Sequence, residues 1–246
     1  MSPWIESLKD SIVYPFRDRR WLAKMWPLPL IALIPVVALL AVVLFKGWRL
    51  AMTARLARGD ESLPELDLVR FLRQGAVLWA FTFLYLFVPG LVCALLGIGG
   101  PFGFVADLFQ IGTGGVQQWA QNEPSDWAWS LLVYLVWAVI SLPVYQAGVV
   151  RYSLGDSWRA MLNVPANLAL FLREAPAFGR FYFNWLVLGL AIAVAGTLLA
   201  LTGIGLPFVP ALTLWLYYSS TAHELGHLAA KVHARADPNA YGALAR

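Results

Sequence analysis

The sequence predicts an all-α, polytopic integral membrane protein, and three observations support this fold class. Of the 246 residues, 60% are apolar and only 13% are charged, whereas a soluble domain is nearer half apolar and a quarter charged. Four long runs contain no Asp, Glu, Lys or Arg. Basic residues are concentrated in some connecting segments and missing from others, which is typical of membrane topology. This composition argues against a nucleic-acid-binding module and a secreted disulfide scaffold.

Four runs have the length of a transmembrane helix. They are residues 75–98, 127–149, 182–203 and 205–222, and about 20 helical residues cross a hydrocarbon core. The last two runs meet at Gly203-Ile204-Gly205, which predicts a tight helical hairpin because glycine is favoured just after a helix end.

The first apolar run, residues 25–45, has a different character because it contains Pro27, Pro29 and Pro35. Pro35 removes a backbone donor in the middle of the run. We predict a re-entrant pair of half-helices bent at Pro35. The alternative is a proline-kinked spanning helix that places the N-terminus outside.

The distribution of Lys and Arg decides between these topologies. There are five in residues 1–24, six in 46–73, four in 150–181 and three in 223–246, and there are none in 99–126 or 203–206. Cytoplasmic segments carry the excess of basic residues. Both termini are therefore predicted to be cytoplasmic, with 223–246 as a cytoplasmic tail.

Amphipathic surface helices are predicted beside the spans, within a single membrane domain covering residues 1–246. Residues 1–24 have apolar positions three and four apart, which predicts an interfacial helix, and Pro15 should end it at Tyr14. Ser62 and Glu65 have capping-box spacing, which predicts a second helix start.

A third surface helix is predicted after Asp156, with Asn163 and Pro165 as an interruption.

The sharpest chemical motif is His223-Glu224-Leu225-Gly226-His227, an H-E-x-x-H pattern. On a helix both imidazoles share a face and can bind one zinc ion, and Glu224 could then act as general base. The motif resembles that of site-2 intramembrane proteases, and His233 has the spacing of a third metzincin ligand.

Other features oppose zinc binding. A zinc protease needs three protein ligands, and no membrane helix follows the motif to supply one. Ala230 replaces the glycine that a metzincin turn requires, so His233 would point away from His227. We therefore expect no metal, no cofactor and no catalytic residue, with zinc at His223, His227 and His233 and catalysis by Glu224 as the alternative.

Polar and aromatic residues within the spans favour helix packing. The spans lack the ionisable groups that ion pathways usually need, and Asn184 is expected to form an interhelical hydrogen bond. Trp137 lies about 15 Å inside its span at 1.5 Å per residue, so its N–H needs a protein partner. Together with Trp137, the expected partner or lipid contacts are Trp21, Trp48 and Arg49.

Several motifs resemble those of a family of uncharacterised prokaryotic multi-pass membrane proteins, a domain of unknown function. The N-terminal Y-P-F-x-D-x-x-W motif occupies residues 14–21, and the loop Gly-Asp-Glu-Ser-Leu-Pro occupies residues 59–64. Residues 155–160, the Gly203 hairpin, and His223 with Gly226 extend the resemblance over nearly the whole chain. The resemblance implies a prokaryotic cytoplasmic membrane protein and no known activity or cofactor.

The expected function is that of a non-enzymatic, membrane-embedded accessory subunit or scaffold. Its partners would be membrane lipids and other membrane protein subunits, and not nucleic acid. The alternatives are a zinc-dependent membrane protease and a transporter or lipid-handling protein.

Overall fold

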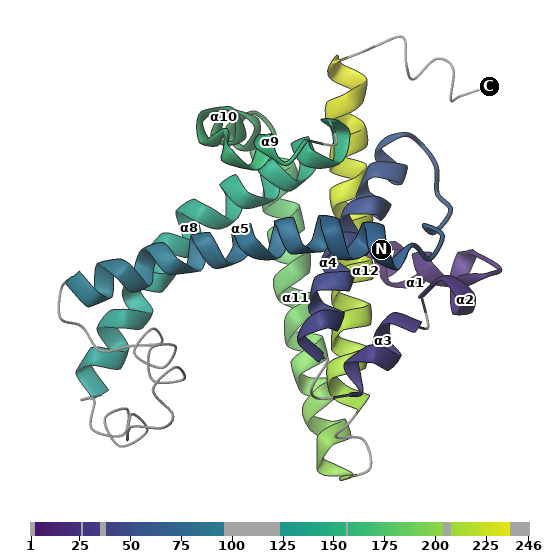
Figure 1. The fold of residues 1–246 in the computed structure, drawn as a ribbon, viewed down its shortest axis with the longest axis horizontal. Coiled ribbons are helices and arrows are strands. Elements are labelled where there is room, and N and C mark those ends of the chain that lie inside the picture. Colours follow the sequence, from purple (N-terminus) through teal and green to yellow (C-terminus); the bar gives the residue numbers. More distant parts are fainter. Residues whose placement is uncertain are drawn as a thin grey trace. The chain divides into compact units, whose positions relative to one another are not determined.

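The computed structural model describes residues 3–25, 27–34, 38–95, 124–155, 157–203 and 208–236. These residues form helices and no strands (Figure 1). The chain divides into two compact units. Unit 1 comprises Met1–Trp79 and Gln146–Arg246, and unit 2 comprises Ala80–Tyr145. The all-α prediction is confirmed for the described residues, whereas this division was not expected from the sequence.

Three described helices are long and apolar enough to cross a membrane. The candidate spans are Leu68–Cys93, Ala128–Gly155 and Ala175–Leu201. They belong to helices α5 (Leu68–Leu95), α8 (Pro124–Gly155) and α11 (Ala175–Leu201), and they overlap the first three of the four predicted spans with different bounds.

The predicted fourth span, 205–222, is not among these candidates. It overlaps helix α12, which is described from Phe208 to Ala236 and continues through the predicted boundary with the tail. The helix reaches Ser219, Ser220 and Thr221 after little more than three turns. The apolar part of the described helix is therefore shorter than a full span.

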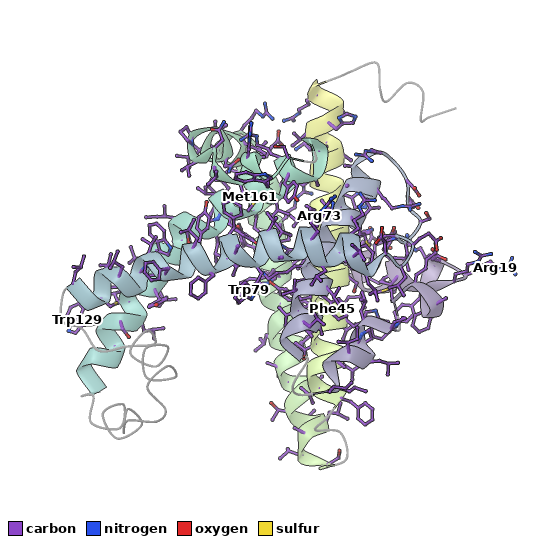
Figure 2. All side chains as sticks on the ribbon, viewed as in Figure 1. Arg19, Phe45, Arg73, Trp79, Trp129 and Met161 are labelled. Atoms are coloured by element: carbon purple, nitrogen blue, oxygen red, sulfur yellow. The ribbon has the colours of Figure 1, made fainter. Side chains whose placement is uncertain are left out.

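Unit 1 is built around helix α4 (Ala38–Ala57), which packs along α12. Phe45, Trp48 and Met52 of α4 share a buried cluster with Tyr218 and Ala222 of α12. Figure 2 shows Phe45 in this interior.

Two glycines in unit 1 permit close helix packing, Gly47 of α4 against α5 and Gly226 of α12 against α4. A Cβ atom on Gly47 would meet the Phe71 carbonyl oxygen at 1.9 Å, and one on Gly226 would meet Leu56 Cβ at 2.5 Å. Close helix approach therefore explains both glycines without requiring an unusual backbone conformation.

The N-terminal segment folds onto the α4–α12 pair. Helix α1 (Pro3–Val13) is followed by the 3-10 helix η1 (Tyr14–Arg17), α2 (Trp21–Met25) and α3 (Pro27–Ala32). The predicted helix end at Tyr14 is confirmed. Helices α1 and α3 pack on α12, and α3 also packs on α4. Pro35, the predicted bend, lies outside the described residues.

The surface-helix predictions have mixed outcomes. Asn163 separates α9 (Arg159–Leu162) from α10 (Val164–Arg173), and its side chain accepts a hydrogen bond from Ala166 N–H as the cap of α10. Asp156 lies outside the described residues.

The capping-box prediction at Ser62 and Glu65 is wrong. Helix α5 begins at Leu68, and Asp67 accepts the hydrogen bond from Arg70 N–H. The hydroxyl of Ser62 instead donates to Asp60, because the loop folds back on itself before the helix begins.

Unit 2 contains a hydrogen bond that accounts for Trp137. Pro89 lies within α5 and has no N–H to give to the Tyr85 carbonyl four residues earlier. The indole N–H of Trp137 on α8 donates to that carbonyl oxygen at 2.7 Å. The predicted protein partner of Trp137 is therefore a backbone group of the same chain.

Candidate functional site

The two histidines of the H-E-x-x-H motif converge in unit 1. His223 Nε2 and His227 Nε2 are 3.1 Å apart, one helical turn from each other on α12. Their rings are perpendicular, with centroids 4.4 Å apart. His223 Nδ1 is buried without a hydrogen-bond partner among the described residues. One of the two Nε2 atoms therefore carries a hydrogen and donates it to the other in a hydrogen bond.

Glu224 faces helix α11 across a small polar pocket. The side-chain amide of Asn184 donates to Glu224 Oε1 at 2.7 Å, so the expected interhelical hydrogen bond of Asn184 is confirmed. The pocket has a volume of about 180 Å³, and Arg180 and Lys231 also line it. Arg180 and Lys231 are exposed, whereas Asn184 and His223 are buried. The pocket thus has a cationic rim and a polar floor.

Burial controls the protonation of this pocket. It lowers the pKa of His223 to about 3, with a further lowering by His227. It also raises the pKa of Glu224 to about 7, against the opposing effects of the Asn184 hydrogen bond and Arg180. At neutral pH, His223 is therefore neutral, and Glu224 is present in both its protonated and its ionised form.

Among the described residues, the motif brings two of the three predicted zinc ligands together. No group of three or more His, Cys, Asp or Glu side chains in the described ranges is arranged to hold a metal ion. His233 does not line the pocket. The Glu224 carboxylate accepts a hydrogen bond from Asn184. The pair of histidines alone falls short of the three protein ligands of a catalytic zinc site.

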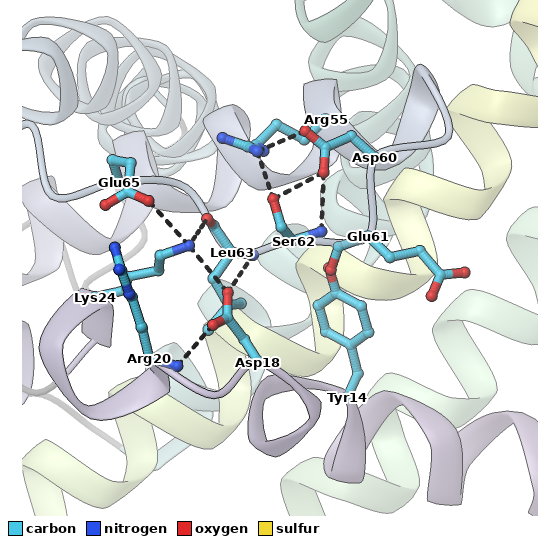
Figure 3. A network of polar contacts seen from close by, with 10 residues as sticks. All are labelled: Tyr14, Asp18, Arg20, Lys24, Arg55, Asp60, Glu61, Ser62, Leu63 and Glu65. Carbon is cyan, nitrogen blue, oxygen red and sulfur yellow. Dashed lines mark hydrogen bonds and ion pairs between the residues drawn. The ribbon is translucent and has the colours of Figure 1, made fainter. Parts of the chain in front are cut away.

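A second polar cluster joins the two segments that carry the sequence motifs (Figure 3). We call it the clasp; it consists of Tyr14, Asp18 and Lys24 with residues 60–65. Tyr14 Oη donates to the Glu61 carbonyl. Asp18 Oδ2 accepts from Leu63 N–H at 3.1 Å and from Lys24 Nζ at 3.0 Å. The N-terminal motif and the loop therefore hold each other in place.

The clasp charges are mutually stabilised. Burial alone would raise the pKa of Asp18, but hydrogen bonds from Arg20 N–H, Lys24 and Leu63 N–H outweigh burial and lower it. The effects on Lys24 have the opposite sign: burial alone would lower the pKa of Lys24, but Asp18 and Glu65 outweigh burial and raise it.

Tyr14 connects the clasp to the pocket, because its ring lies 4.6 Å from that of His223.

Three of the predicted contact residues lie in unit 1. Trp48 is fully buried and Arg49 is 2% exposed, with the Arg49 guanidinium 5.7 Å from the Tyr218 ring centroid. Both belong to the interior of unit 1 because other helices cover α4 there, and their predicted contact with a partner or lipid stays a prediction. Trp21 is half-buried at the edge of an apolar groove.

Sequence reasoning missed Glu174 as an organising residue. Its side chain is 1% exposed and accepts from Arg235 and from Lys231, the latter at 2.8 Å. It precedes the first residue of α11 and ties that end to the last turns of α12. No local pattern marks this role, since the cations come from a helix more than fifty residues away. Sequence reasoning also missed Arg180 in the pocket lining and the contact of Tyr14 with His223, for the same reason.

The fold is helical, and three helices among the described residues are long and apolar enough to span a membrane. The chain belongs to DUF4013, a family of proteins of unknown function, which matches residues 30–206. No curated protein and no solved structure matches the chain. The matched region includes Arg180 and Asn184 but not the histidines of α12.

Proposed function

We propose that the protein is a non-enzymatic, membrane-embedded subunit or scaffold that binds other membrane proteins through α11 and α12. The observation that carries this proposal is an open groove of about 440 Å³ along the two helices. We call it the small-residue groove. Its lining includes Gly189, Ala193, Gly196 and Ala200.

The small-residue groove has the properties of a helix-docking face. Small residues let the backbones of transmembrane helices approach closely. A Cβ atom on Gly189 would meet no atom within 4 Å, so space remains there for another helix. Thr197 and Thr213 add hydroxyl groups to the same lining. The occupant we propose is a transmembrane helix of a partner subunit.

The remaining surface of α11 suits lipid. Leu186, Leu190 and Leu198 are exposed, and only 11% of the most apolar window of this helix is buried. Such a face is unfavourable in water and stable in a bilayer.

The proposed placement is the prokaryotic cytoplasmic membrane, with four spans, a re-entrant segment at 25–45 and both termini cytoplasmic. The basic segments support this orientation. The packing of α3 against α4 supports the re-entrant segment, because two half-helices that return to one side lie against each other.

Filling the small-residue groove tests the partner proposal. Gly189→Leu combined with Ala193→Leu should abolish isolation of a larger complex in mild detergent, since the added side chains occupy the partner's space. Leu190→Ala, on the exposed face of the same helix, is the matched control and should retain the complex. A groove-filled variant that still co-purifies with the same proteins as wild type would refute this docking face.

The convergence of His223 and His227 keeps a zinc-dependent membrane protease as the alternative function. Elemental analysis of the purified protein separates the two. We expect no stoichiometric zinc and unchanged folding of Glu224→Gln. One zinc ion per chain, lost in His223→Ala, would favour the protease.

A further inference from the structure

We propose that a second groove in unit 1 holds the acyl chain of an anionic membrane phospholipid, with the phosphate at Arg19 and Arg20. This inference rests on the proposed membrane placement but not on the partner helix. We call this groove the acyl groove. It lies between α2 and α3 on one side and α11 and α12 on the other.

The acyl groove is lined only by apolar and aromatic residues. Its volume is about 330 Å³, at the lower end of the roughly 300–1,000 Å³ typical of small-molecule sites. A groove of this volume with a purely apolar lining is suited to a single hydrocarbon chain.

The acyl groove is elongated along α12. Phe208, Leu212 and Trp215 line it at intervals of about one turn, so it extends about 10 Å along the helix at 1.5 Å per residue. Leu30 of α3 and Leu33, just after this helix, line it from the other side. This shape fits an extended chain.

Aromatic rings close one end of the acyl groove. Trp21 and Trp215 are stacked in nearly parallel planes, with centroids 5.6 Å apart. Phe16 meets Trp21 edge-on at 5.0 Å and Trp215 at 5.3 Å. Tryptophan is enriched at the headgroup level of a bilayer, so we assign this end to the lipid headgroup.

Two arginines beside the aromatic end supply the charge. Arg19 and Arg20 precede Trp21 directly and have exposed side chains, and Arg19 projects away from the helices (Figure 2). The neighbouring cations are engaged, Arg17 with Asp10 and Lys24 with Asp18 and Glu65. No ion pair involves Arg19 or Arg20 within the described part of the chain. Guanidinium groups bind phosphate in a bidentate manner, and the cytoplasmic leaflet is anionic.

The test is lipid binding to the full-length, delipidated protein in detergent, measured by native mass spectrometry. The probes are phosphatidylglycerol and phosphatidylcholine with identical acyl chains. Wild type should retain one phosphatidylglycerol per chain in preference to phosphatidylcholine. Replacing Arg19 and Arg20 together by Gln should weaken phosphatidylglycerol binding about 30-fold and leave phosphatidylcholine unaffected. Arg70→Gln with Arg73→Gln is the charge control and should bind like wild type.

Blocking the acyl groove tests the chain position separately. Leu212→Trp and Leu30→Trp each place a bulky ring at a partly exposed lining position and should abolish retention of both lipids. Leu190→Trp, outside the lining, should not. Equal retention in all variants, or none in wild type, would overturn the inference.

The partner proposal is tested independently of this outcome. A wild-type chain without bound lipid that still assembles with its partner subunit overturns the acyl groove alone. Cross-linking of a partner helix, rather than lipid, to position 30 would also overturn the acyl-groove proposal.

Discussion

Asp18 is the residue on which the clasp depends most. Its carboxylate is 12% exposed, and its partner Lys24 is 9% exposed. Asp18→Asn removes one of the two carboxylates that pair with Lys24 and weakens the hydrogen bond from Leu63 N–H, while Glu65 stays paired with Lys24, so the protein should be destabilised by about 2 kcal/mol. Thermal unfolding in detergent measures this change. Asp10→Asn removes an exposed pair with Arg17 in the same segment and should cost under about 1 kcal/mol. Equal effects of both variants would contradict a buried clasp.

The clasp also has a defined pH window. The lowered pKa of Asp18 contributes stability above its unfolded value of about 4, and this is lost as the pH falls through the folded value. The raised pKa of Lys24 contributes stability below its unfolded value of about 10, and this is lost as the pH rises through the folded value. The clasp should therefore be at full strength between these limits.

Glu224 should make stability fall as the pH rises towards neutrality. Its folded pKa is about 7 and its unfolded pKa is about 4.3, so between these values the folded state binds more protons than the unfolded state. The free energy of unfolding then decreases with increasing pH. Glu224→Gln should remove this decrease when melting temperatures are compared from pH 4 to 8. The His223 contribution has the opposite sign but is present in both proteins. Exposed Glu6→Gln is the control, and Glu224→Gln curves parallel to wild type would contradict the assignment.

At the scale of elements, the bond between Trp137 and the Tyr85 carbonyl should hold α5 and α8 together within unit 2. Trp137→Phe leaves that carbonyl without a donor and should cost about 1–2 kcal/mol, measured by unfolding in mixed detergent micelles. Trp129→Phe, on an exposed position of the same helix, should cost almost nothing. In a Pro89→Ala background the helix regains its own N–H, so Trp137→Phe should become less costly. An undiminished cost there would contradict the explanation.

Helix positions were largely predictable, because long apolar runs and proline act locally. The end of α1 at Val13 followed from Pro15, and three of the four spans followed from hydropathy. The start of α5 was not predictable from Ser62, since its hydroxyl is engaged by Asp60 and Arg55. The continuation of α12 past residue 222 was also missed. There Ser219, Ser220 and Thr221 are buried, so a polar run did not mark a helix end.

The candidate pocket was predictable only in part. The spacing of His223 and His227 places both rings on one face of a helix, and the structure has them in contact. Asn184 and Arg180 come from another helix, so their place beside Glu224 depends on tertiary packing. The burial of Trp48 and Arg49 depends on the helices that cover α4, which their own segment does not reveal.

At the scale of the whole molecule, the distribution of basic residues predicts the topology. Single cysteines at Ser2 and Gly114, in a Cys93→Ala background, report the side of the membrane on which each lies. Both positions lie outside the described residues. In intact cells Gly114→Cys should label with an impermeant thiol reagent, and Ser2→Cys should label only after the membrane is opened. Labelling of Ser2→Cys from outside would replace the re-entrant segment by a kinked span.

The central claim is that the chain functions as a subunit of a larger membrane assembly. The most direct measurement is the mass of the particle extracted from native membranes in a mild, lipid-preserving detergent or polymer. We expect a particle that contains this 27.2 kDa chain with a different membrane protein at fixed stoichiometry, and its loss in Gly189→Leu with Ala193→Leu. A wild-type particle that contains one copy of the chain and lipid alone would contradict the claim.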